Sequence, residues 1–148
     1  MNEPRIPSRI EYPDLPVVKK REEFLELLKH RQVIIVKADT GSGKSTQVPK
    51  FLLESGLAET GRIGVTEPRR LAAMSIADRL REELKDETLV STRIRFLEEG
   101  PKDAPLKVMT DGILLQEFRR DRLFRQYSAI LVDEAHERSL NIDILLEI

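Results

Sequence analysis

A short apolar run followed by a glycine-rich loop constrains the fold of this chain more than any other feature of its sequence. Residues 32–37 (QVIIVK) are rich in β-branched side chains and predict a β-strand. Residues 44–54 predict a helix, and the loop between the two segments (ADTGSG) contains two glycines. Loops of this kind let backbone N–H groups converge on an anion at the start of a helix. We therefore expect a strand–loop–helix unit with an anion-binding loop.

The rest of the chain alternates between strand-like and helix-like segments. Further strands are predicted at residues 62–66, 92–96, 106–109 and 128–132. Helices are predicted at residues 17–30, 69–84 and 111–120, and another starts at residue 140. Such alternation is typical of βαβ units. We therefore expect an α/β fold with a mostly parallel sheet and helices on both faces.

Four loops that follow predicted strands carry polar or glycine-rich sequence. They span residues 38–45, 66–70, 110–112 and 133–136. Right-handed crossovers place the carboxyl ends of parallel strands at one edge of the sheet, which is where ligands bind in such folds. We therefore expect these loops to share one active face.

Residues 41–45 (GSGKS) match the end of a phosphate-binding pattern. Lys44 would reach the β- and γ-phosphates of a nucleotide, and the hydroxyl of Ser45 would bind Mg²⁺. The strict pattern has glycine at the position of Ala38. A simple Gly/Ser turn is the alternative, and it is disfavoured because a turn has no need of Lys44.

Two carboxylates, Asp133 and Glu134, end the last predicted strand. An aspartate there can bind Mg²⁺, and its neighbour can activate an attacking water. Because consecutive strand residues point to opposite faces, the two can act together only if the backbone turns after Val132. Alone, the Asp-Glu pair is typical of a solvated strand end, and His136 is typical of a surface residue. Beside a phosphate-binding loop, the pair predicts nucleotide hydrolysis.

Composition excludes several other classes of protein. The 148 residues contain no cysteine, so neither a disulfide framework nor a thiolate metal site is possible. The net charge of −1 argues against a broad basic surface but allows a few local contacts to phosphates. No apolar run is long enough to span a membrane or resembles a secretory signal, so we expect a cytoplasmic protein with no membrane partner.

The chain has an expected arm and one expected domain. Four prolines within residues 1–16 predict an extended arm outside the core. Residues 17–148 are long enough to form one α/β domain, and the apolar content of 40% suits a globular chain.

Five motifs carry a resemblance to a known family. They are ADTGSGKSTQVPKF, TEPRRLAAMSIADRL, RIRF, KVMTDGILLQE and DEAHERSLNIDILL. In this order they resemble the DEAH-box helicases of superfamily 2, and the phrases IEYPDLPV and ERSLNID are most similar to bacterial ATP-dependent RNA helicases of the HrpA type. The resemblance runs from about Arg9 to the end of the chain. It implies a RecA-like P-loop NTPase domain that binds ATP and Mg²⁺.

The resemblance implies a nucleotide site. ATP would be bound by Thr40, Gly41, Ser42, Gly43, Lys44, Ser45 and Thr46, and Arg79 would stack on the nucleobase. Ser45 and Asp133 would hold Mg²⁺. Glu134 would be the catalytic base, assisted by Lys44, and His136 would link the site to a second lobe. Without the resemblance, Arg79 reads as a solvated helix residue.

The resemblance also implies a path for RNA. Arg69, Arg70, Arg95 and Thr110 would hold the backbone of a single strand independently of its sequence. From the residues alone, Arg69 and Arg70 are a charged helix start, although positive charge there opposes the helix dipole. Glu67 stands where glutamine is typical of the family, and a carboxylate beside the RNA should weaken that contact slightly.

Several parts of the family pattern lie outside the 148 residues. They are the Ser-Ala-Thr strand, the second RecA-like lobe with its arginine finger, and the C-terminal domains. The resemblance thus implies a first RecA-like domain that is incomplete at its C-terminus, with a vacant position between strands 32–37 and 128–132. We expect the ATP-binding part of an RNA helicase, inactive by itself. A stand-alone nucleotide-responsive binding module is the alternative. A small kinase is disfavoured, because it explains only the phosphate-binding loop.

Overall fold

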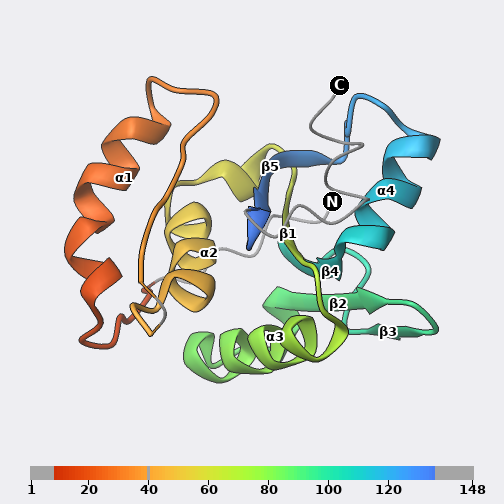
Figure 1. Cartoon of the computed structure of the whole chain (residues 1–148), viewed down its shortest axis with the longest axis horizontal. Coiled ribbons are helices and arrows are strands. Elements are labelled where there is room, and N and C mark those ends of the chain that lie inside the picture. The colour runs from red at the N-terminus through yellow and green to blue at the C-terminus, as the bar shows by residue number, and fades with distance from the viewer. Residues whose placement is uncertain (1–8, 40, 136–148) are drawn as a thin grey trace.

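Five strands form one sheet in the computed structural model, which describes residues 9–39 and 41–135 (Figure 1). The strand order is β3-β2-β4-β1-β5. The strands are β1 (Arg62–Glu67), β2 (Val90–Ile94), β3 (Leu97–Glu99), β4 (Leu106–Thr110) and β5 (Tyr127–Val132). All neighbouring strands are parallel except β2 and β3. The mostly parallel sheet agrees with the expected α/β, RecA-like fold.

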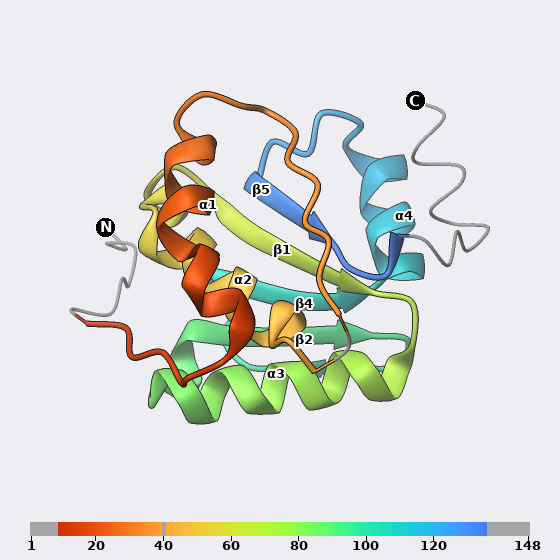
Figure 2. The same cartoon turned by 60° about the vertical axis from the view of Figure 1, so that its left-hand side comes forward.

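Helices cover both faces of this sheet (Figures 1 and 2). They are η1 (Pro16–Lys20), α1 (Arg21–Leu28), α2 (Lys44–Glu54), η2 (Leu57–Glu59), α3 (Arg70–Leu84), η3 (Glu87–Leu89) and α4 (Asp111–Arg120), where η marks a 3₁₀ helix. Ile63 and Val65 of β1 belong to the core that α1, α2 and α3 cover, whereas Met109 of β4 packs with Ile113 and Leu114 of α4. Because successive side chains of a strand point to opposite faces of the sheet, the same sheet contributes to the cores on both faces.

The carboxyl ends of three parallel strands meet at one edge of the sheet. Glu67 of β1 is paired with Thr110 of β4, and Thr66 is paired with Val132 of β5. Figure 2 shows β4, β1 and β5 side by side, with their arrowheads pointing the same way. The loops that follow these strands therefore begin next to one another.

Residues 32–37 do not form the strand that the sequence predicted. Val33 and Ile35 are 80% and 81% exposed, whereas Ile34 and Val36 pack against the core. A strand needs a neighbour for its ladder hydrogen bonds, and no strand of the described ranges pairs with this segment. The prediction was wrong because an apolar pattern does not tell whether a neighbouring strand is present.

The β2–β3 hairpin also differs from the prediction of a single strand at residues 92–96. The backbone turns at Arg95 and Phe96, and β3 returns antiparallel to β2. Phe96 has φ of 66°, which is uncommon for a residue other than glycine. The sequence therefore carried no signal for this turn.

The N-terminal arm contacts the core more than its sequence indicated. Residues 9–15 form neither helix nor strand, yet Ile10 and Tyr12 pack against the core. The boundary at residue 17 between arm and domain stays a prediction. The helix expected from residue 140, together with Thr40 and His136, lies outside the described residues. No helix in the described part of the chain has the length and apolar character needed to cross a membrane.

Candidate nucleotide-binding site

The loop before α2 has the backbone shape of an anion-binding turn. Gly41 and Gly43 have φ of 86° and 92°, a left-handed conformation that glycine adopts without steric cost. Gly43 is the N-cap of α2, and Lys44 is its first residue. The Thr46 hydroxyl donates a hydrogen bond to the carbonyl oxygen of Gly43 over 3.3 Å, within the same turn. The first amides of α2 therefore face a position where an anion can accept their hydrogen bonds.

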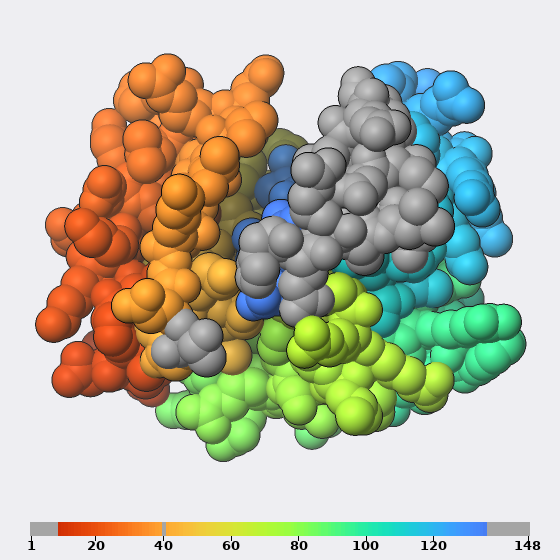
Figure 3. All heavy atoms as spheres, viewed as in Figure 1, coloured from red at the N-terminus to blue at the C-terminus, as the bar shows by residue number. Residues whose placement is uncertain are grey.

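The structure brings Lys44 and Ser45 into contact with Asp133. The hydroxyl of Ser45 donates to Asp133 Oδ2 over 2.5 Å, and Lys44 Nζ lies 3.5 Å from Asp133 Oδ1. The backbone N–H of Asp133 donates to the carbonyl of Thr66, so Asp133 continues the ladder of β5. In Figure 3 the phosphate loop, the start of α3 and the end of β5 appear on one face. Two motifs that are far apart in the sequence thus form one site.

Glu134 reaches the same site through a backbone turn. Its φ of 55° is left-handed, and its N–H donates to Asp133 Oδ1 over 3.0 Å. Glu134 Oε1 lies 3.9 Å from Lys44 Nζ. The chain therefore turns directly after β5, and both carboxylates lie near one lysine. This is the arrangement that joint action of the two carboxylates requires.

Glu67, at the end of β1, forms a buried carboxyl pair with Asp133. Burial, together with the hydrogen bond and the charge of Asp133, raises the pKa of Glu67 to about 10. Burial would also raise the pKa of Asp133, but hydrogen bonds from Glu67 and Ser45 and the charge of Lys44 hold it below its ordinary value. At neutral pH, Glu67 therefore carries the proton and Asp133 the negative charge.

The expectation that Glu67 would disturb RNA was wrong. Its side chain is 2% exposed and lies against Asp133. Because β1 is buried to its last residue, this carboxyl group supports the candidate metal-binding side chain. Sequence reasoning identified the unusual residue but not the partner that it meets.

The residues of this site fit a magnesium–nucleotide complex. Residues 9–39 and 41–135 contain no group of three or more His, Asp or Glu side chains that could hold a metal. Mg²⁺ does not need one, because it binds one or two protein oxygens and completes its shell with water and phosphate oxygens. The oxygens of Ser45 and Asp133, already in contact, form such a pair. The buried Ser42 hydroxyl, which has no protein partner, lies in the same loop.

Arg79, the candidate nucleobase contact, is half-exposed on α3 and tied to α2 through Glu83. Arg79 Nε donates to Glu83 Oε2 over 2.8 Å. Glu83 also accepts hydrogen bonds from Gln47 and from the fully buried Lys50, at 3.0 and 3.1 Å. The helix after the phosphate loop thereby orients Arg79. Sequence reasoning missed Glu83, because an Arg–Glu pair four residues apart is ordinary on helices.

The candidate RNA contacts lie at two helix starts and one turn. Arg69 and Thr110 are the N-cap residues of α3 and α4. Arg70 Nη1 donates to the carbonyl oxygen of Arg95 over 3.5 Å, so these two lie together. Sequence reasoning missed Phe96, which is 89% exposed with the Arg95 guanidinium 4.9 Å from its ring centre. An exposed aromatic ring beside arginine is a surface on which nucleobases stack.

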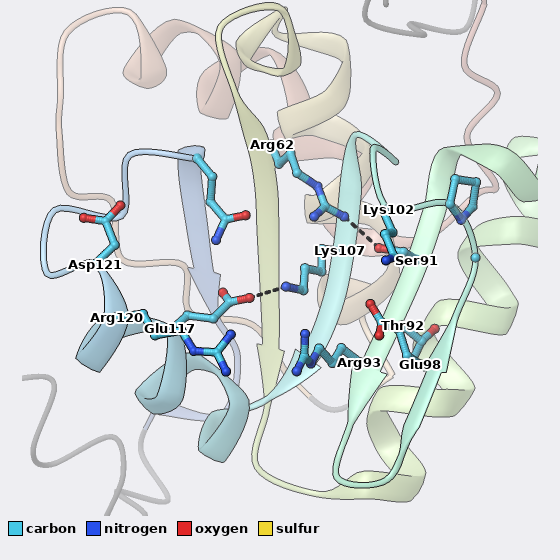
Figure 4. A pocket seen from close by; sticks show the side chains of 13 residues that line it. Arg62, Ser91, Thr92, Arg93, Glu98, Lys102, Lys107, Glu117, Arg120 and Asp121 are labelled. Atoms are coloured by element: carbon cyan, nitrogen blue, oxygen red, sulfur yellow. Dashed lines mark hydrogen bonds and ion pairs between the residues drawn. The ribbon is translucent and has the colours of Figure 1, made fainter.

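A pocket of about 330 Å³ lies elsewhere, near the amino ends of the strands (Figure 4). Arg62 begins β1, and Lys107 is the second residue of β4. The Arg62 guanidinium donates to Ser91, and Lys107 pairs with Glu117 of α4. Both Arg62 and Lys107 therefore have protein partners at the end of the sheet opposite to Glu67. The pocket therefore does not belong to the candidate nucleotide site.

Comparisons with known proteins confirm the resemblance that the motifs indicated. A family model for DEAD/DEAH box helicases matches residues 19–143. The chain is 51% identical over 140 residues to the ATP-dependent RNA helicase HrpA of Escherichia coli, covering 93% of this chain and 11% of that protein. It is 47% identical over 144 residues to the HrpA homolog of Haemophilus influenzae, covering 95% and 11%. It is 44% identical over 139 residues to the probable ATP-dependent RNA helicase DHR1 of Saccharomyces cerevisiae, covering 89% and 11%. The chain thus spans about 11% of the length of these relatives.

Proposed function

Because the chain belongs to the DEAD/DEAH box helicase family, we propose that it is the ATP-binding part of an ATP-dependent RNA helicase. The observation that carries this proposal is the contact of Lys44 and Ser45 with Asp133. ATP hydrolysis needs a phosphate-binding loop and a metal-binding carboxylate in one site, and this contact joins the two. A cytoplasmic location is part of the same proposal.

Each side chain has a role in this proposal. The amides of residues 41–45 bind phosphate oxygens, and Lys44 exchanges its carboxylate partners for the β- and γ-phosphates. Ser45 and Asp133 hold Mg²⁺, which supplies charge neutralisation when it is bound. Glu134 accepts a proton from the attacking water. Arg79 stacks on the nucleobase, and Thr40, Thr46 and His136 keep the roles that the family resemblance implies.

Removal of the Lys44 amine should abolish most nucleotide binding. Hydrogen bonds to charged groups contribute about 1.5–3 kcal/mol, so Lys44→Ala should weaken binding roughly ten- to hundredfold. Titration of the 148-residue chain with a fluorescent ATP analogue and Mg²⁺ measures this. Lys19→Ala, a change at an exposed lysine in η1, serves as the control and should bind as the wild type does. Equal binding by the two variants would contradict the proposal.

Replacement of Glu134 should separate binding from hydrolysis. We expect negligible turnover from the chain alone, because an arginine finger contributes about 10³–10⁵ in rate and the family's second lobe supplies it. In a longer protein that includes this chain and a second lobe, Glu134→Gln should lower kcat about 10²–10⁴-fold without weakening ATP binding. Substantial ATPase activity of the isolated chain, removed by the same substitution, would refute the two-lobe requirement.

RNA binding should be weak and independent of sequence. About three phosphate contacts predict a slope near −2 in a plot of log K against log salt concentration for a single strand. Arg70→Ala should make the slope shallower by about 0.7, whereas Arg31→Ala, at an exposed position before the phosphate loop, should not change it. Fluorescence anisotropy with labelled single-stranded RNA measures both. Discrimination between base sequences would contradict binding through the backbone.

A further inference from the structure

Residues 10–17 (IEYPDLPV), which we call the strap, run along α2 and reach the phosphate loop. At one end, the N–H of Val17 donates to the carbonyl oxygen of Ser42 over 3.1 Å. Leu15 packs against Gly43: a Cβ atom at that glycine would lie 2.6 Å from Leu15 Cδ1. The strap therefore fills the space directly behind the two residues that precede α2.

The other end of the strap is bound to the body of α2. Lys50 Nζ, fully buried, donates to the carbonyl oxygen of Glu11 over 2.6 Å. The Tyr12 hydroxyl donates to Glu54 over 2.5 Å, and the ring centroids of Tyr12 and Phe51 are 5.5 Å apart. The strap is thus attached near both ends of the helix that follows the phosphate loop.

Two prolines restrict the strap between these attachments. Pro13 and Pro16 fix φ and favour extended geometry in the residues before them, Tyr12 and Leu15. The strap therefore has few alternative conformations to lose when it packs on α2. A stiff segment that is attached at both ends can help to hold a glycine-rich loop in one conformation.

We propose that the strap, through Leu15, sets nucleotide affinity by holding Ser42 and Gly43 in their anion-binding conformation. The proposal rests on the proposed nucleotide site. Leu15 acts on the loop from behind and is a positioning residue. Nothing lies within 4 Å of a Cβ atom built at Gly41, whereas Leu15 approaches that position at Gly43, so the strap packs on the loop next to α2. Without the strap, nucleotide binding would have to order the loop, at a cost of about 1–2 kcal/mol for each residue ordered.

Leu15→Ala is the direct test. If the substitution leaves one loop residue to be ordered by the ligand, binding of a fluorescent ADP analogue should weaken roughly five- to thirtyfold. Leu57→Ala is the matched control, because Leu57 is also a partly buried leucine but packs on the core from η2, away from the strap. We expect the control to keep wild-type affinity even where its melting temperature falls as much. Leu15→Met, which keeps the volume, should restore affinity.

Hydrogen exchange without nucleotide separates the strap from the proposed function. In Leu15→Ala, amides of residues 41–45 should exchange faster than in the wild type, whereas Leu57→Ala should leave them unchanged. If the wild type binds no nucleotide, the proposed function fails, and exchange still decides whether the strap orders the loop. The proposal for the strap is overturned if Leu15→Ala has the exchange rates and the affinity of the wild type. It is also overturned if Leu57→Ala shows the same losses. If Leu15→Ala does not fold, Leu15→Val replaces it, with a roughly two- to threefold loss expected.

Discussion

β1 and residues 32–37 are six-residue segments that both lead into candidate functional loops, yet only β1 is a strand. By composition, residues 32–37 (QVIIVK) are the stronger strand former, with four β-branched apolar residues against two in β1 (RIGVTE). β1 is nevertheless buried from Ile63 to Glu67, whereas Val33 and Ile35 are exposed. The difference shows that neighbours decide strand formation in this chain.

The hydrogen bonds of the backbone explain this difference. β1 lies between β4 and β5, so both of its edges are paired. Residues 32–37 have no strand partner in the described ranges, so no ladder of backbone hydrogen bonds holds them there. A buried backbone group without a partner costs about 1–3 kcal/mol, so an unpaired segment stays at the surface. Within the part of the chain that the structure describes, β5 is bonded only to β1, and it is correspondingly half-buried.

Hydrogen exchange should show the largest contrast between the two segments. Amides in the middle of β1 should exchange only through global unfolding, at a free energy of about 5–15 kcal/mol. Amides of residues 32–37 should open at a free energy near zero. Exchange followed by NMR or mass spectrometry measures both. Slow exchange in residues 32–37 would mean that the segment finds a strand partner in solution.

The same substitution in each segment should then give unequal losses of stability. Ile63→Ala removes a fully buried side chain and should lower the free energy of unfolding by about 2–5 kcal/mol. Ile35→Ala changes a side chain that is 81% exposed and should cost less than about 0.5 kcal/mol. Urea unfolding of the two variants measures the difference. Similar losses of stability in the two variants would contradict the difference in burial between β1 and residues 32–37.

A further expected effect concerns pH and the buried end of β1. The pKa of Glu67 is about 10 in the folded chain against an ordinary value of 4.5. Above pH 4.5 the unfolded chain releases this proton while the folded chain keeps it, so stability falls as pH rises toward 10. The slope is at most about 1.4 kcal/mol per pH unit.

Glu67→Gln should remove this pH dependence. The variant should gain stability relative to the wild type between pH 6 and pH 8, as followed by urea unfolding at each pH. Glu59→Gln, a change at an exposed position in η2, is the control and should follow the wild-type curve. A constant difference between Glu67→Gln and the wild type across this range would mean that Glu67 is ionised in the folded chain.

Local signals in the sequence predicted several elements closely. The predicted bounds of α2 and α4 agree with the structure: α2 begins directly after the glycine-rich loop, and α4 begins directly after Thr110 at the end of β4. The expected approach of Lys44 and Asp133 is also found, with their charged atoms 3.5 Å apart, although the segment before the loop of Lys44 is not the strand on which that expectation relied. The functional roles of these residues stay proposals.

Other features depended on contacts between distant parts of the chain. The turn at Phe96 has no glycine to signal it, and the packing of Leu15 on Gly43 joins segments separated by all of α1. The partner of Glu67, Asp133, follows a different strand, so the position of Glu67 in the sequence did not indicate that the two carboxyl groups meet. Such features follow from packing, which periodicity does not describe.

The sequence by itself determined α2, α3 and α4, the phosphate-binding loop and the family, because apolar periodicity, glycine conformation and motif order are local properties of the chain. The tertiary structure alone decided which apolar segment became a strand and which carboxyl group kept its proton. The reason is that ladder hydrogen bonds and desolvation both depend on what lies across from a residue, and that neighbour comes from a distant part of the sequence.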